Sequence, residues 1–340
     1  MSRLLGIELT RPTLIDDDDC DAEYPTTHKE EQNLSEDPFH PSKPTLLLSS
    51  ILVARLLSPL ARLCRQECIP TEQIRNFDAL LADCMRQLPP QLRLDSPDLL
   101  DPLTVAPLIH LQNARIVLHR QNMSLICSSQ QRSIAIQDSI SAALDTARTI
   151  ARIYPLNTTS TNVEGRLLAA SNMLLCTHVW RCMLLLAYGN AWPQFHALLR
   201  VTSLIADRKT INISCGRHLS LFLQCLIERY QAGNVSELDR DEEVMMYLSG
   251  DLLNRPKSPA ESRGKGHGIE AGSPLRSGAH KGWDSVLSDK EDKPWLGWNQ
   301  TLQEALRLER LSAATLSAKA VGSSPAESSS QSKMKISSII

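Results

Sequence analysis

Two groups of cysteines have the close spacing that a structural zinc site needs. Cys64 and Cys68 are four residues apart, and Cys176 and Cys182 flank His178. Thiolates and imidazoles are ligands that zinc prefers, but a helix places Cys176 and His178 on different faces. Cys64 and Cys68 share a helix face, yet the sequence offers no second pair with the spacing to complete a tetrahedron. We therefore predict that these residues belong to the core and that the chain binds no metal.

The other candidates for chemistry are weaker. The acidic run 16–19 lacks the central Gly and the terminal Glu of a calcium-binding loop, so a solvated loop is favoured. The sequence contains no phosphate loop that ends in Lys-Ser/Thr, no Gly-x-Ser-x-Gly elbow and no His-Glu-x-x-His motif. It names no partner for His110, His119, His196 or His218. We therefore expect that the protein is not an enzyme.

The composition is that of a chain with a folded core and little net charge. Of the 340 residues 42% are hydrophobic, which is enough to bury a core. The 36 basic and 38 acidic residues give a net charge of -2, without the positive field that draws proteins to DNA phosphates. The nine scattered cysteines are typical of reduced thiols in a nuclear or cytosolic protein, and no signal peptide opens the chain. We expect no autonomous DNA binding.

The apolar residues between 45 and 250 recur with helical spacing, and no stretch alternates long enough to propose a strand. The spacing predicts an all-α bundle in which the first two helices pack antiparallel. The predicted helices are 45–63 with a kink at Pro59, 71–88, 105 towards Cys127, 136–154, 163–188, 195–208, 213–231 ending near Gly233, and 239–249 ending at Gly250.

The helix predicted at 163–188 is apolar nearly all round, so we place it at the centre of the bundle. Its part 167–188 is long enough to span a bilayer, but Asn172, His178 and Arg181 interrupt it. A core helix is therefore favoured over a membrane span. Trp180 in this helix is predicted to be a core anchor, because a buried indole contributes a large contact area.

Shifts in composition divide the chain into five regions. Residues 251–294 are rich in Pro, Gly, Ser and charge, so they cannot bury enough surface to order themselves. Ser258 and Ser273 in this region each precede a proline and are candidate phosphorylation sites. The five regions are an extended acidic lead-in (1–44), a helical regulatory domain (45–250), a disordered linker (251–294), a C-terminal helix with two tryptophans (295–318) and a Ser-rich disordered tail (319–340).

Three segments carry motifs that occur together in one protein family. Segment 5–25 contains Arg-Pro, an acidic loop and a later Pro, with Thr10 in place of the family's usual Gly; segment 108–120 ends in Leu-His-Arg, followed by Gln121 instead of Pro. The third segment runs through 176–251 and then from Trp295 to Trp298, and it is similar to the C-terminal part of a subset of the family. In this order they resemble the regulatory, or middle homology, region of fungal zinc-cluster transcription factors. The residues that carry the resemblance are Arg11, Pro12, Asp18, Asp19, Pro25, Leu118, His119, Arg120, His178, Trp180, Arg181, Gly216, Arg217, Ser249, Gly250, Asp251, Trp295 and Trp298.

The resemblance implies a multi-helix bundle of the fungal transcription factor regulatory domain type, which controls RNA polymerase II transcription in the nucleus. Its partners would be transcriptional co-regulators or full-length relatives, with a small effector held between helices, and no membrane is expected. The family's six-cysteine zinc cluster has no counterpart in this sequence. No cofactor is therefore expected for this chain. Zinc and DNA would be bound only by an N-terminal domain that is missing from it, and the resemblance implies that the sequence is a truncated gene product or a partial gene model.

Two other functions stay open. A truncated regulator that does not bind DNA would compete with full-length relatives for their partners. A helical enzyme or small-molecule carrier, from a different class, would hold its ligand in a pocket beside the helix that contains Cys176 and Cys182.

Overall fold

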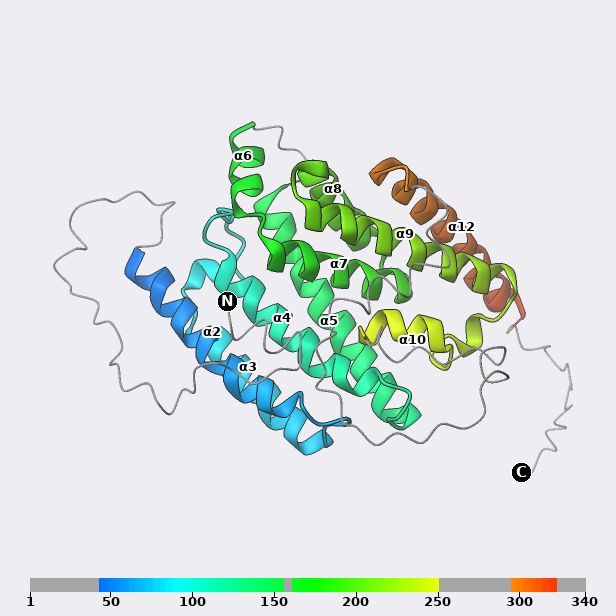
Figure 1. The fold of residues 1–340 in the computed structure, drawn as a ribbon, viewed down its shortest axis with the longest axis horizontal. Coiled ribbons are helices and arrows are strands. Elements are labelled where there is room, and N and C mark those ends of the chain that lie inside the picture. The colour runs from blue at the N-terminus through cyan, green and yellow to red at the C-terminus, as the bar shows by residue number, and fades with distance from the viewer. Residues whose placement is uncertain (1–42, 156–160, 251–294, 323–340) are drawn as a thin grey trace, which may run out of the picture.

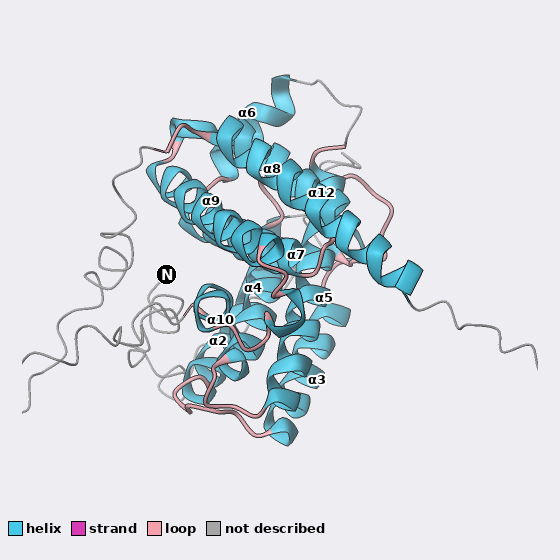
Figure 2. Cartoon of the chain, turned by 90° about the vertical axis from the view of Figure 1, so that its right-hand side faces the viewer, coloured by secondary structure: helices cyan, strands magenta, loops and turns pink. Residues whose placement is uncertain are grey.

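The structure is a computed structural model, and it describes residues 43–155, 161–250 and 295–322. Every regular element in these ranges is a helix, which confirms the all-α, multi-helix prediction (Figures 1 and 2). The α-helices are α2 (Lys43–Leu63), α3 (Thr71–Gln87), α4 (Ala106–Arg120), α5 (Ser129–Ile153), α6 (Thr161–Ala170), α7 (Met173–Tyr188), α8 (Trp192–Ile205), α9 (Thr210–Gln231), α10 (Glu242–Ser249) and α12 (Trp298–Gly322).

The first two helices lie close to their predicted positions. α2 begins two residues before the predicted start and continues through Pro59 to its end at Leu63. α3 places Ile74, Phe77 and Leu81 of the predicted stripe in the core. The prediction that Cys64 and Cys68 share a helix face is wrong, because α2 ends before both and Cys68 lies in the following loop.

The predicted third helix is too long, because α4 ends at Arg120 and does not reach Cys127. A 3-10 turn follows, in which the Asn122 side chain accepts a hydrogen bond from the backbone N of Ile69 at 2.8 Å and donates one to its carbonyl at 2.7 Å. α5 begins earlier than predicted, because Ser128 and Gln131 form a reciprocal capping box at its N-terminus.

The single helix predicted at 163–188 is wrong: two helices, α6 and α7, meet there at 97°. The break lies at Ser171 and Asn172, and the Asn172 side chain accepts a hydrogen bond from the backbone N of Leu175 at 2.9 Å. An Asn side chain satisfies a free N–H at a helix start, and it therefore favours a new helix over the continuation of the old one. Asn172 thus turns α6 away from α7 (Figure 1).

The second of these helices lies at the centre of the bundle, as the sequence predicted for this region. α7 packs against α5, α8 and α9, and it also contacts α4 and α10. Most of its side chains are buried, including Cys176, His178 and Trp180. Trp180 is 4% exposed, so its prediction as a core residue is confirmed.

Two parts of the described chain are apolar enough, by length and composition, to be compared with membrane spans. The window Leu46–Leu63 of α2 has a mean hydropathy of 1.6, and 33% of it is buried. The second segment consists of two helices, Asn162–Ala170 and Met173–Tyr188, which are separated by a bend of 97°. They are long and apolar enough for a membrane span only if they are counted together. Core helices of folded domains have the same composition, and the sequence interpretation missed the window in α2.

The last described helix packs on the same body as the others. α12 lies along α9 and also contacts α8, as both overall views show (Figures 1 and 2). Trp192 Nε1 on α8 donates to Ser312 Oγ at 3.0 Å, and His196 Nε2 lies 2.9 Å from Glu309 Oε2. The C-terminal helix predicted at 295–318 therefore packs on the bundle as α12. The linker predicted at 251–294 lies outside the described residues.

Candidate functional site

Several of the residues singled out from the sequence lie outside the described residues. Their predicted roles in the acidic lead-in, the linker and the family-like motifs stay predictions. They are Arg11, Pro12, Asp18, Asp19, Pro25, Asp251, Ser258 and Ser273, and the Ser-rich tail beyond residue 322 is also outside.

The Leu-His-Arg motif at the end of α4 sends its three side chains in different directions. Leu118 is fully buried in the core. His119 is 3% exposed and lines an open groove, whereas Arg120 lies beside Gly250 at the end of α10. A Cβ atom added to Gly250 would lie 3.3 Å from Arg120 Nη1, and Gly250 has a φ of +70°. Gly250, directly after Ser249, is thus favoured by its left-handed backbone, and a side chain there would also press on the tip of Arg120.

We call the groove at His119 the polar groove. It has a volume of about 680 Å³ and opens between α3, α4 and α5. Four carboxylates, three guanidinium groups and the imidazole share its wall with apolar side chains from α3 and the loop after it. The lining residues are Asp78, Leu81, Ala82, Met85, Arg86, Arg93, Leu94, Asp95, Arg115, His119, Asp138 and Asp145.

The imidazole of His119 lies between two carboxylates of the polar groove. Its Nε2 is 3.1 Å from Asp78 Oδ1, and its Nδ1 is 3.7 Å from Asp138 Oδ2. The first distance is that of a hydrogen bond, but the second is too long for one. Nδ1 is buried and has no hydrogen-bond partner among the described residues. His119 therefore presents an unused polar atom next to an acidic side chain.

One helical turn away, the charged groups of the polar groove are paired. Arg115 Nη1 donates to Asp145 Oδ2 at 2.7 Å and to Gln112 Oε1 at 2.9 Å. The other oxygen of Asp145 accepts from Arg148 Nη1 at 2.7 Å. Arg93 donates to the carbonyl of Leu88 at 3.2 Å and, through Nη2, to that of Arg86 at 3.1 Å. These bonds hold the two guanidinium groups in the wall of the groove.

The cysteines and histidine of α7 form a buried contact without the geometry of a metal site. His178 Nε2 lies 2.9 Å from Thr146 Oγ1 and 3.7 Å from Cys182 Sγ. Burial raises the pKa of Cys182 to about 12 and that of Cys176 to about 11. Metal ligation requires thiolates, which such thiols do not readily form. Among residues 43–155, 161–250 and 295–322, no group of three or more His, Cys, Asp or Glu side chains is placed to hold a metal ion.

The family-like residues of the third segment meet where α9 contacts α12. Trp295 and Trp298 pack edge to face, with ring centroids 5.7 Å apart and an interplanar angle of 85°. Both rings lie over Gly216: a Cβ atom there would be 2.5 Å from Trp295 Cζ2 and 3.0 Å from Trp298 Cζ2. Trp295 Nε1 donates to Thr301 Oγ1 at 3.1 Å. The absence of a side chain at Gly216 therefore permits both tryptophans to pack on α9.

Trp180 and His218 extend this contact to α7, with ring centroids 5.9 Å apart. Burial, and then the charge of Arg217, lowers the pKa of His218 to about 4. Burial disfavours the charged imidazolium, so the imidazole is neutral near pH 7. We call Trp180, Gly216, His218, Trp295 and Trp298 the tryptophan side. The two family-like arginines lie apart from these rings: Arg217 is exposed, and Arg181 Nη1 donates to Asn113 Oδ1 at 3.3 Å.

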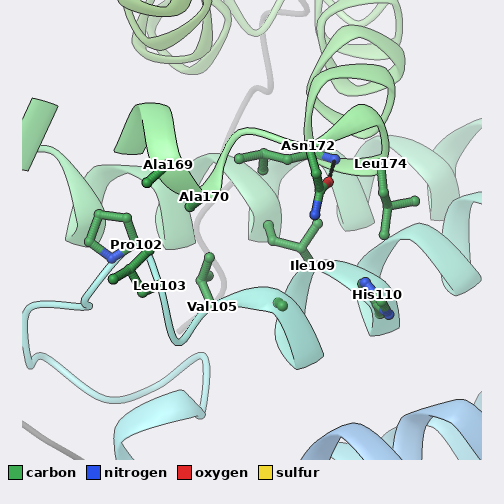
Figure 3. Close-up of a pocket in the computed structure, with 11 residues that line it drawn as sticks. Pro102, Leu103, Val105, Ile109, His110, Ala169, Ala170, Asn172 and Leu174 are labelled. Carbon is green, nitrogen blue, oxygen red and sulfur yellow. Dashed lines mark hydrogen bonds between the residues drawn. The ribbon is translucent and has the colours of Figure 1, made fainter. Parts of the chain in front are cut away.

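A smaller, mainly apolar pocket of about 270 Å³ lies where α4, α6 and α7 meet the loop before α4 (Figure 3). Pro102, Val105 and Ala169 are among its apolar lining residues, and Asn172 and His110 add polar groups. Burial lowers the pKa of His110, so a neutral imidazole borders the pocket. Leu174 and Leu175 of α7 also line this pocket, so it lies beside the helix that contains Cys176 and Cys182, where the carrier alternative expected a ligand.

The sequence interpretation missed the partners that give His119 its environment. Asp78 and Asp138 lie on other helices, far from His119 in the sequence. An acidic residue on the exposed side of an amphipathic helix is ordinary, so neither aspartate was distinguishable from a solvated surface charge. Only the antiparallel packing of α3, α4 and α5 brings the three side chains together.

Comparison with known proteins gives no match: no family model, no curated protein and no solved structure matches the chain.

Proposed function

We propose that the chain is the regulatory module of a transcription factor of the fungal zinc-cluster type. It acts in the nucleus on RNA polymerase II transcription, through partner proteins or a small effector. The proposal rests on the ordered set of segments that resemble this family. We also propose that the helical bundle is of the type found in the family's regulatory domains.

The observation that supports the proposal most is the contact of Gly216 with Trp295 and Trp298. These residues come from separate parts of the resembling pattern, and residues 251–294 lie between them in the sequence. Gly216 was singled out by the resemblance, and the two tryptophans by the resemblance and by the C-terminal helix predicted around them, yet all three meet, and their contact needs a glycine. A chance set of short motifs has no reason to converge in this way. The Arg120–Gly250 contact joins two further family-like residues from distant segments.

The experiment is a reporter assay in which the full 340-residue chain is fused to an unrelated DNA-binding domain. The proposal expects a change in reporter transcription relative to the DNA-binding domain alone, and nuclear enrichment of a tagged chain without the fused domain. Unchanged transcription from a well-expressed fusion, together with a strictly cytosolic tagged chain, would contradict it.

A second function, that of a small-molecule-binding protein, is favoured by the two cavities. The apolar pocket is small, whereas the polar groove has about 680 Å³ and an unused buried nitrogen. Ligand pockets combine apolar walls with a few placed polar groups, as the polar groove does. A thermal-shift screen of metabolites tests this function. A screen without any stabilising compound, on a chain that melts cooperatively, would count against it.

A further inference from the structure

A buried nitrogen in the polar groove lacks a hydrogen-bond partner among the described residues. His119 is 3% exposed, and its Nδ1 is one of the buried polar atoms without a partner. A buried polar atom left without a hydrogen bond destabilises a fold, because it has lost its bonds to water and gained none in the protein. Natural structures therefore seldom keep such an atom unless water, an ion or a ligand satisfies it.

The hydrogen-bond roles of His119 define what is missing. Nε2 lies 3.1 Å from Asp78 Oδ1, and an ionised carboxylate only accepts, so Nε2 carries the proton. In the neutral imidazole Nδ1 is then an acceptor, and it faces Asp138 Oδ2, another acceptor, at 3.7 Å. A donor placed between them would satisfy both acceptors. An ammonium group has three N–H donors and a positive charge, and it suits this position next to two carboxylates.

The groups of the groove that are already paired indicate which charge a ligand should carry. The donors of Arg115 are directed at Asp145 and Gln112. Those of Arg93 are directed at backbone carbonyls. These two guanidinium groups are therefore held by partners within the protein, and Arg86 is paired with Asp83. By contrast, no described residue donates a hydrogen bond to the Asp138 carboxylate, and Asp78 accepts one only from His119.

The rest of the wall suits an apolar stem. Leu81, Met85 and Leu94 line the groove beside the charged groups. A ligand with a short alkyl chain would place its ammonium at His119 and cover these side chains. Burial of each methylene group of the stem would add to the affinity.

We propose that the polar groove binds a small ligand with a protonated aliphatic amine, whose ammonium lies between Asp78, His119 and Asp138. This inference deepens the proposed function, because the ligand would be the effector of the regulatory module. Only that role of the ligand rests on the proposed function. Binding itself is a property of the purified chain.

The test is calorimetric titration of the purified full chain with n-hexylamine at neutral pH. Two matched probes have the same stem: n-hexanol, which is neutral, and hexanoate, which is anionic. We expect saturable binding of hexylamine, at least about tenfold weaker binding of hexanol, and no binding of hexanoate. Equal affinity for hexylamine and hexanol, or no saturable binding of hexylamine below roughly 10 mM, would overturn the proposal.

The variants Asp138→Asn and Asp78→Asn test the position of the ammonium. Both aspartate side chains are partly exposed, so removal of their charge should leave the fold intact. Each should weaken hexylamine binding at least about tenfold. The control is Asp207→Asn, which removes the same charge at an exposed position outside the groove and should bind as the wild type does. Unchanged affinity of Asp138→Asn and Asp78→Asn would overturn the proposed position.

The titration and the reporter assay fail independently. If the purified chain binds hexylamine as expected but the fusion does not change transcription, the proposed function is wrong and the amine site stands. If the fusion changes transcription but the chain does not bind the amine, the inference about the groove is wrong and the proposed function stands.

Discussion

The tryptophan side is built on α7, α9 and the start of α12, whereas the polar groove opens between α3, α4 and α5, and the two regions differ in what fills them. On the tryptophan side, rings fill the space over Gly216, and burial lowers the pKa of His218. In the polar groove, charges are paired at one end and His119 Nδ1 is left without a partner at the other. Trp298 Nε1 on the tryptophan side also has no hydrogen-bond partner among the described residues, so the difference lies in the space: rings fill the first region, whereas the second keeps a groove of about 680 Å³ that a ligand can enter. Substitutions in the two regions should therefore separate stability from binding.

The largest effect is expected for Trp180→Ala on the tryptophan side. Trp180 is 4% exposed in the central helix α7, and its removal leaves a cavity that the surrounding helices cannot fill. We expect the free energy of unfolding to fall by about 3 to 5 kcal/mol, measured by urea melts. A loss below about 1 kcal/mol would show that α7 does not organise the core.

Gly216→Val should have the next largest effect. The first added carbon would lie 2.5 Å from Trp295 Cζ2, so Trp295 and Trp298 must move away from α9. Overpacking of this kind destabilises by about 1 to 3 kcal/mol, and increased cleavage of α12 in limited proteolysis should accompany it. The control is Gly165→Ala, because no atom lies within 4 Å of a Cβ atom at Gly165 and alanine favours the helix. Equal stability of the two variants would contradict the packing account.

The pH dependence of stability should come partly from His218. Burial lowers its pKa from 6.5 to about 4. Between these values the unfolded chain binds a proton that the folded chain does not. The free energy of unfolding should therefore fall as the pH drops through this window, by up to about 3 kcal/mol. Urea melts across the window measure this slope. His218→Phe keeps a ring beside Trp180 without a titrating group and should reduce the slope; an unchanged slope would exclude His218 as its source.

The smallest effect on stability is expected for Asp138→Asn in the polar groove. Its side chain is 47% exposed, and its nearest polar contact is His119 at 3.7 Å. Substitutions at such positions change the free energy of unfolding by less than about 0.5 kcal/mol. The same urea melts check this value. A loss as large as that of Gly216→Val would show that the groove also stabilises the fold, and it would break the comparison.

The helices could be predicted from the sequence because apolar spacing depends on local geometry. The stripe of α3 and the burial of Trp180 followed directly from it. The break at Asn172 did not, because the surrounding residues are apolar on both sides and neither Gly nor Pro marks the position. An Asn can cap a new helix or face solvent within a long one. The packing of α6 and α7 decides between the two, and the spacing of apolar residues carries no information on that packing.

The sites were less predictable than the helices. Gly216 and the two tryptophans were singled out through the family resemblance, but their contact required the position of α12 on α9. His119 was noted without a partner, since Asp78 and Asp138 come from two other helices. Sites assembled from several helices depend on packing between segments that are far apart in the sequence, and one sequence read alone carries little of that information.

The reporter assay with matched variants tests the account most directly. Fusions of the wild type, Asp138→Asn, Gly216→Val and Gly165→Ala are compared at equal expression. We predict that the wild type and Gly165→Ala change transcription equally, and that Gly216→Val loses the effect together with its folded fraction. Asp138→Asn should keep the folded fraction of the wild type and respond differently to added amine. Identical transcription from all four fusions, including no change relative to the DNA-binding domain alone, would contradict the account.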